Sequence, residues 1–200
     1  MRICVVGGTG LIGSAVADAL SDRHEVIRVG NSSGEYRVDL GSKESIEELY
    51  EEMEPVDAVA SAAGRAAFGP LEELADDEFR LGLDNKFVGQ ANLVRVGLDH
   101  VNDGGSFTLV SGILSREPTT GSSAVSPANA ALEAFARAAS LEMPRGLRVN
   151  VISPPWVAET LEELGRDPSP GMPAARVANA YVESIEGDRN GDVIDARDFA

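Results

Sequence analysis

Cysteine and histidine are scarce in this chain of 200 residues. A single cysteine, Cys4, excludes any disulfide within the chain and fits a reducing compartment. The two histidines, His24 and His100, lie far apart without the spacing of metal ligands, and we interpret both as surface or helix-end residues. The sequence therefore predicts neither a disulfide framework nor a metal site.

Long apolar runs are also missing. No segment approaches the roughly 20 consecutive apolar residues that a membrane-spanning helix needs. No signal peptide precedes the first strand-like run, which begins at Ile3. We therefore expect a cytoplasmic protein without a membrane partner.

Positive charge is the third shortage. The chain has 17 Lys and Arg residues against 33 Asp and Glu, a net charge of −16, and only Lys43 and Lys86 are lysines. Nucleic acid is a poor partner for such a chain, because like charges repel. An acidic, lysine-poor composition suggests a halophilic protein, although a GC-rich genome would also explain the shortage of lysine.

What the chain does contain is a glycine-rich turn near its start. The apolar run Ile3–Val6 suits a strand buried on both faces, and helical periodicity begins at Leu11. The glycines between them can turn tightly and let backbone N–H groups approach a diphosphate at the helix N-terminus. A purely structural turn is the alternative. The residues that we expect to bind a dinucleotide here are Gly7, Thr9, Gly10, Leu11, Ile12 and Gly13.

Strand-like and helix-like segments alternate along the remaining chain. Further strands are expected at 24–29, 36–40, 56–60, 107–110, 148–152 and 192–194. The main helices are expected near 11–20, 42–53, 77–98, 127–142 and 177–185. This alternation predicts the α/β class: a Rossmann-like, doubly wound parallel sheet flanked by helices, in a single domain. Ser42 or Ser45 should cap the second helix, and Pro127 should be the first residue of the fourth.

The end of the second strand bears on the choice of cofactor. In dinucleotide folds this strand end meets the adenosine ribose, where an acidic residue binds the 2′-hydroxyl and repels a 2′-phosphate. The sequence has Asn31, Ser32 and Ser33 there, with Arg28 nearby. This pattern favours NADP over NAD, and a simple polar turn is the alternative interpretation.

Five segments together resemble the short-chain dehydrogenase/reductase family across nearly the whole chain. They are Gly7–Gly13, Asp39-Leu40, Ser61-Ala-Ala-Gly64, Asn129–Phe135 with Ala138–Glu142, and Arg148–Val157 with Thr160. The resemblance implies an NAD(P)-binding domain over residues 1–200 and hydride transfer between a nicotinamide and an alcohol or carbonyl carbon. It adds further expected cofactor-binding residues, namely Asp39, Leu40, Ala62, Ala63, Gly64, Pro154 and Val157.

The resemblance breaks down at the family's catalytic residues. The family uses a tyrosine as general acid/base, a lysine four residues later, a serine and a supporting asparagine. The aligned positions hold Val125 for the tyrosine, Asn129 for the lysine and Lys86, beside Asn85, for the asparagine. No tyrosine occurs between Tyr50 and Tyr181. Ser111 remains for the serine, although strict spacing would place Gly112 there.

Two functions remain open from the sequence. The first is an NADP-dependent oxidoreductase for a small carbonyl or alcohol, with Lys86 and Ser111 as its catalytic residues. The second is a catalytically silent dinucleotide-binding protein that acts as a sensor or assembly subunit. A protein that binds small molecules in the same pocket without nucleotide is a further alternative. Lys86 could instead reach solvent or pair with Asp84. The resemblance also implies a homodimer or homotetramer, formed through the helices at 77–98 and 127–142.

Overall fold

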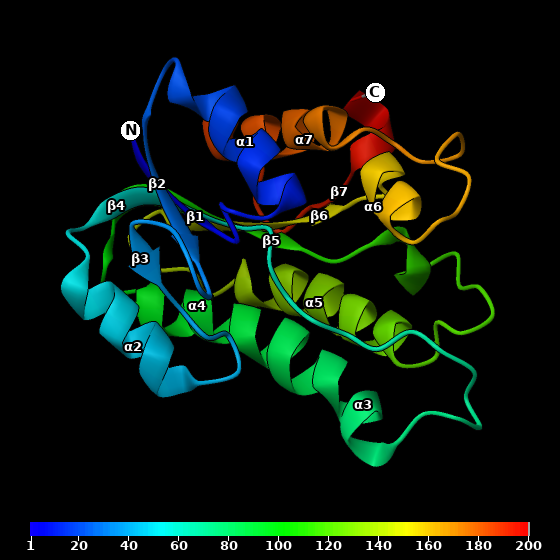
Figure 1. Ribbon diagram of the computed structural model, residues 1–200. Helices are drawn as coiled ribbons and strands as arrows, with labels where there is room; N and C mark the ends of the chain where they lie inside the picture. The colour runs from blue at the N-terminus through cyan, green and yellow to red at the C-terminus, as the bar shows by residue number, and fades with distance from the viewer. Residues whose placement is uncertain (200) are drawn as a thin grey trace.

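The computed structural model describes residues 1–199, and one seven-stranded parallel sheet lies at its centre (Figure 1). The strands are β1 (Arg2–Val6), β2 (Glu25–Gly30), β3 (Tyr36–Arg37), β4 (Val56–Ser61), β5 (Val101–Val110), β6 (Arg148–Ser153) and β7 (Val193–Asp195). Their order in the sheet is β3-β2-β1-β4-β5-β6-β7. The chain winds in opposite directions from β1 and from β4, so a crevice opens at the carboxyl ends of these two strands. The predicted Rossmann-like fold is confirmed.

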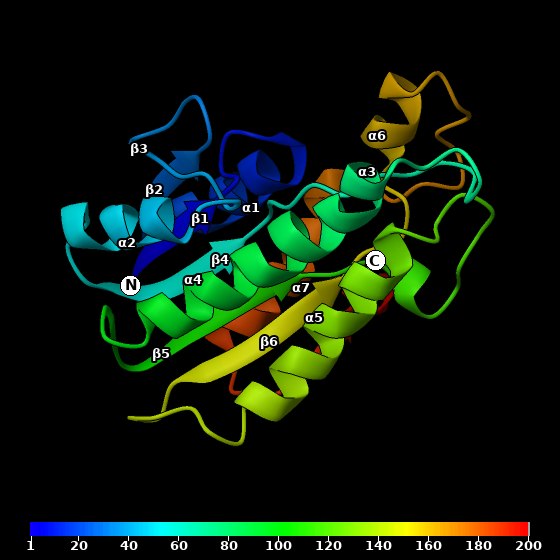
Figure 2. The ribbon, with the colours of Figure 1, turned by 90° about the horizontal axis from the view of Figure 1, so that it is seen from below.

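Helices cover both faces of the sheet (Figures 1 and 2). α1 (Leu11–Ser21) and α7 (Ala174–Glu186) lie on one face, and α2 (Lys43–Glu52), α4 (Gln90–Gly97) and α5 (Val125–Ala139) lie on the other. In β1, Ile3 and Val5 pack toward α1 and α7, whereas Cys4 and Val6 pack toward the opposite layer. The strand is apolar at every buried position because both of its faces are covered.

The expected helix over 77–98 is three consecutive segments. α3 (Asp76–Leu81) is followed by a π-helical stretch, Gly82–Gly89, and then by α4. We call Gly82–Gly89 the π segment. Such wide turns inside helices are rare and are frequent at functional sites. A short helix, α6 (Ala158–Glu163), lies between β6 and α7.

Several expected boundaries were wrong. β3 is limited to two residues, and β5 begins already at Val101.

Of the two serines expected to cap the second helix, Ser42 is the cap of α2. Its hydroxyl accepts the Ser45 N–H at 3.1 Å, whereas the Ser45 hydroxyl accepts the Asp39 N–H at 3.0 Å. Pro127 is the third residue of α5 and not the first. A proline is tolerated there because the N–H groups of the first helical turn have no intrahelical acceptor.

The single cysteine and the two histidines all have close neighbours in the fold. Cys4 is fully buried, and burial raises the pKa of its thiol to about 12. The His24 ring lies 2.9 Å from the Glu186 carboxylate, and the His100 ring stacks on Tyr50. Within residues 1–199, the helices are all too short or too polar to cross a membrane.

Candidate functional site

Two adjoining cavities open at the carboxyl ends of the strands. The first, of about 340 Å³, is called the β5-side cavity here. It lies among Ile12, Ala62, Lys86, Gly112, Val125, Asn129, Trp156 and neighbouring residues. The second, of about 370 Å³, is called the β2-side cavity, and it lies among Gly7, Asn31, Asp39, Leu40, Arg65, Asn85 and their neighbours. Ala63 and Gly64 line both, so an extended ligand could pass from one to the other.

The glycine turn lies between β1 and α1, beside both cavities. Gly7 has a φ of 82° and donates its N–H to the Val29 carbonyl at 2.8 Å. A Cβ at Gly13 would overlap the carbonyl oxygen of Gly7, so glycine is required for α1 to approach the turn. Gly10, in contrast, is exposed and has an extended conformation that other residues also adopt. The turn therefore brings the N-terminus of α1 to the crevice with backbone N–H groups available to an anion.

The β2-side cavity brings together several of the residues expected to bind the cofactor. Asn31, Asp39, Leu40, Ala63 and Gly64 all line it, whereas Ser32 is exposed but not among the lining residues. The Asp39 carboxylate accepts the N–H of Gly41 at 2.8 Å.

Arg28, which was expected near the ribose, is engaged elsewhere. Its guanidinium donates to the Asp18 carboxylate at 2.6 Å and to the Gly8 carbonyl at 3.2 Å. These contacts hold the side chain against α1 and the glycine turn. Arg28 is therefore not a free cation that could bind a ligand at the end of β2.

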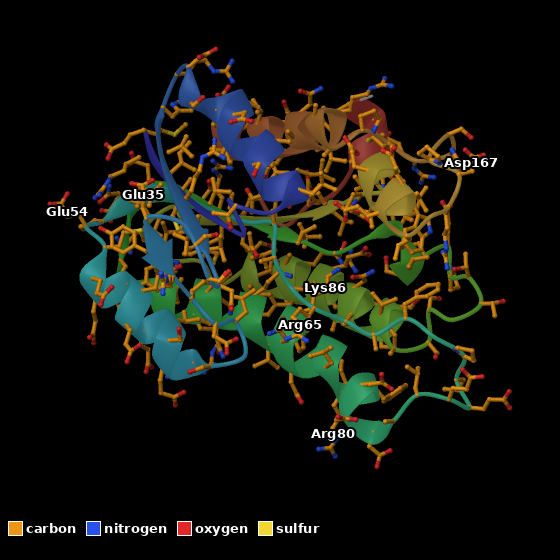
Figure 3. All side chains as sticks on the ribbon, viewed as in Figure 1. Glu35, Glu54, Arg65, Arg80, Lys86 and Asp167 are labelled. Atoms are coloured by element: carbon orange, nitrogen blue, oxygen red, sulfur yellow. The ribbon has the colours of Figure 1, made fainter. Side chains whose placement is uncertain are left out.

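Lys86 lies on the π segment (Figure 3) and lines the β5-side cavity, next to Gly64, which lines both cavities. Its ammonium donates to the main-chain carbonyl of Ser111 at 2.8 Å, and within residues 1–199 it forms no ion pair. The stem packs on Gly64, where a Cβ would lie 2.7 Å from Lys86 Cγ. The residue keeps some exposed surface, but its ammonium is enclosed, and this burial lowers the pKa of Lys86 to about 8. The alternatives of a solvent-directed side chain and a pair with Asp84 do not describe this geometry.

Ser111 meets Lys86 through its backbone and not through its hydroxyl. The hydroxyl donates to the Glu133 carboxylate at 3.1 Å and lies 3.3 Å from the Ile152 carbonyl. Glu133 also accepts the Ser115 hydroxyl at 2.6 Å. The Ser111 hydroxyl is therefore engaged inside the protein, and what it helps to hold in place is the carbonyl that binds Lys86. Sequence reasoning missed Glu133, because a glutamate within a helix has no distinguishing signal.

The positions aligned with the family's tyrosine and lysine do line the β5-side cavity, as Val125 and Asn129. Asn129 donates its amide to the Gly112 carbonyl at 3.3 Å, and its Oδ1 is buried without a partner. Tyr50 and Tyr181 are buried elsewhere, with their hydroxyls bonded to the Leu93 and Ser61 carbonyls at 2.7 and 2.9 Å. Within residues 1–199, no tyrosine lines either cavity.

These features define the general class of the protein. A doubly wound parallel sheet, a glycine turn at its crevice and a two-part cavity beside that turn are the arrangement of a Rossmann-type nucleotide-binding protein. A family model described as enoyl-(acyl carrier protein) reductase matches residues 7–186. The chain belongs to the short-chain dehydrogenase/reductase family of oxidoreductases.

Comparisons with individual proteins agree with this assignment. The solved structure of the protein lin1944 from Listeria innocua is 39% identical, covers 98% of each chain and superposes with a TM-score of 0.92. A small-chain dehydrogenase crystallised in complex with NADPH is 26% identical, with a TM-score of 0.85 over 98% of this chain and 95% of its own. The 3-oxoacyl-[acyl-carrier-protein] reductase of Mus musculus is 25% identical over 78% of this chain and 75% of its length. Hydroxynaphthalene reductase of Aspergillus fumigatus is 29% identical over 64% of this chain, which spans about half (49%) of that enzyme.

Proposed function

We propose that this protein is an NADP(H)-dependent reductase of small carbonyl compounds in which Lys86 takes over two roles, the positive charge of the family's lysine and the proton donation of its tyrosine. The observation that carries the proposal is the position of the Lys86 ammonium. It is enclosed beside the β5-side cavity and, within residues 1–199, is bound only to the Ser111 carbonyl, which leaves N–H donors free for another oxygen.

The residues around the cavities fit a nicotinamide dinucleotide. The glycine turn offers N–H groups to the diphosphate, and the β2-side cavity offers Asn31, Asp39 and Leu40 to the adenosine. In the β5-side cavity, the unpartnered Oδ1 of Asn129 is a buried acceptor that a ribose hydroxyl would satisfy. The cofactor would supply the hydride. The fit is supported by the relative that was crystallised with NADPH.

Lys86 can perform the other half of a carbonyl reduction. A carbonyl oxygen that gains negative charge as its carbon is reduced needs a nearby cation and then a proton. An ammonium with a pKa of about 8 is mostly protonated at neutral pH, yet it releases its proton far more readily than an ordinary lysine. Ser111 contributes by orienting this ammonium through its carbonyl, and Glu133 acts as a positioning residue through the Ser111 hydroxyl.

A silent dinucleotide-binding protein is the second candidate function. It is favoured by Val125 and Asn129 in the β5-side cavity, since valine cannot transfer a proton and an amide does not replace the charge of the family's lysine. This candidate predicts cofactor binding without turnover.

Titration and turnover together separate the two candidates. The wild-type chain would be titrated with NADPH and NADH by calorimetry and then assayed for NADPH oxidation over a panel of small aldehydes and ketones. The reductase proposal expects turnover that Lys86→Met reduces by about 100-fold or more while cofactor affinity changes little. Tight NADPH binding without turnover of any carbonyl would favour the silent protein, and absence of binding would reject both.

A further inference from the structure

Arg65 is a cation in the β2-side cavity that the family's pattern does not account for. It follows Gly64 directly, is exposed and lines this cavity with Asn31 and Asp39. It is the single positively charged residue among the residues that line the cavity. Within residues 1–199 its guanidinium has no carboxylate partner. In a chain with a net charge of −16, an unpaired arginine in a ligand cavity suggests an anionic ligand.

The local backbone holds Arg65 in place. Its N–H donates to the Asn85 side-chain carbonyl at 2.8 Å, and Asn85 precedes Lys86 on the π segment. Gly64 has a φ of 140°, and Lys86 packs against it. The same wide helical turn therefore positions both Lys86 and the base of Arg65 (Figure 3).

The other charged side chains near the cavity either have a partner or do not line the cavity. The Asp39 carboxylate accepts the Gly41 N–H, and the Arg28 guanidinium is held by Asp18 and by the Gly8 carbonyl. Arg37 is in register with Gly30 in the sheet, but it is not among the residues that line the cavity. Arg65 is thus the cation available to an anionic group that approaches Asn31.

We propose that Arg65 binds the 2′-phosphate of NADP(H) and makes the protein prefer NADP(H) over NAD(H). The proposal rests on the dinucleotide binding of the proposed function. Arginine suits the role because its fork of N–H donors matches phosphate oxygens and its charge does not titrate. Asn31, directly after β2, is uncharged, so it does not repel the phosphate as an acidic residue at this position would.

The test compares NADPH with NADH, which differ only in the 2′-phosphate. Calorimetry on the full chain would measure both dissociation constants for wild type, Arg65→Gln, Arg37→Gln and Arg80→Gln. Arg80 lies in α3, well apart from Arg65, and serves as the matched control for the loss of one charge (Figure 3). Arg65→Gln should weaken NADPH binding by about tenfold or more and NADH binding by less than about twofold. Arg80→Gln should change neither constant.

Several results would overturn this assignment. An equal loss for NADPH and NADH would place Arg65 on the diphosphate or the adenine, and no loss for either would remove it from the site. A selective loss in Arg37→Gln in place of Arg65→Gln would move the role to β3. Thermal unfolding of each variant would confirm that the fold is retained. NADPH binding that depends on Arg65 without turnover of any carbonyl would reject the reductase function and leave this inference standing, whereas a wild-type chain that binds neither coenzyme rejects both.

Discussion

Lys86 is the residue on which the proposed chemistry of this protein depends. Its ammonium is buried without a counter-ion among residues 1–199, and burial of a charge costs free energy unless the charge is paired and hydrogen-bonded. One carbonyl contact offsets only part of that cost, and the depressed pKa of Lys86 expresses the remainder. A lysine in such a place is better explained by chemistry than by stability, and the next two predictions test this.

Carbonyl reduction should depend on pH through Lys86. In the proposed reaction the protonated form of Lys86 is the proton donor. Because the pKa of Lys86 is about 8, turnover in the direction of reduction should fall as the pH rises through about 8. Lys86→Arg keeps the charge but cannot release a proton readily, so its residual activity should show no decline near pH 8. Steady-state rates between pH 6 and about 10 would show this. Lys43→Arg is the control, because Lys43 is the other lysine and lies on α2; an unchanged profile in Lys86→Arg would contradict the assignment.

Lys86→Met should stabilise the protein at neutral pH. The folded-state pKa of about 8 lies below the ordinary value of 10.5, so the unfolded chain binds more protons between these values and stability rises with pH across that interval. Below pH 8 the ammonium is charged in both states and the whole cost of its burial applies. Removing it should raise the free energy of unfolding by about 1–3 kcal/mol at pH 7. Denaturant unfolding at pH 7 and pH 10 would measure this, and a clear loss of stability would indicate a structural role.

At the scale of elements, the glycine turn and the π segment shape the site from opposite sides. Gly89 ends the π segment where a Cβ would overlap the Leu40 carbonyl, so glycine allows this helix to approach the segment after β3. The wide turn directs two successive side chains, Asn85 and Lys86, toward different partners at the same site. A π-helix has more residues per turn than an α-helix. If the same residues formed a regular α-helix, Asn85 and Lys86 would point in other directions relative to the rest of the helix.

Two alanine substitutions in the glycine turn should have different effects. Gly13→Ala would force α1 away from Gly7 and should cost about 3 kcal/mol or more. Gly10→Ala should cost about 1 kcal/mol or less, because Gly10 has an extended backbone and its Cβ would lie no closer than 3.3 Å to Gly7. It should nevertheless weaken NADPH binding by about tenfold, since the added methyl would stand where we expect the diphosphate to approach the backbone. Chemical denaturation and calorimetry on both variants would separate the effects, and unchanged affinity in Gly10→Ala would place the diphosphate elsewhere.

At the scale of the whole molecule, the outer helices present an uncovered apolar surface. Val88 at the end of the π segment is 42% exposed, and Phe79 in α3 is 40% exposed. Ala130, Ala134 and Ala138 form an exposed stripe along α5, next to the π segment. This surface matches the predicted association through the helices at 77–98 and 127–142, and the oligomeric state itself stays a prediction.

A charge placed in that surface should lower the oligomeric state, and with it the molar mass measured in solution. Val88→Glu should convert a homodimer or homotetramer into smaller species, because a carboxylate buried at an interface without a partner is costly. Light scattering coupled to size exclusion would measure the masses, with Leu164→Glu, an exposed residue just beyond α6, as the control. A wild-type chain that elutes as a monomer at micromolar concentration would contradict the expectation.

The adaptation to high salt and the cytoplasmic location, both expected from the sequence, likewise stay predictions.

The sequence alone determined the sheet, because the strand in Ile3–Val6, the glycine turn and the alternation of strands and helices are local patterns with one physical interpretation. It also located Val125, Asn129 and Lys86 in the cavity, since the family's spacing is kept within a helix even where the residue types change. It could not determine where side chains reach: Arg28 was expected near the ribose but is engaged by Asp18, and the Ser111 hydroxyl is engaged by Glu133. Those contacts join residues far apart in the chain. Only the tertiary structure could decide that Lys86 is enclosed and that Arg65 faces a cavity, because burial and the choice of partner depend on the packing of all the layers together.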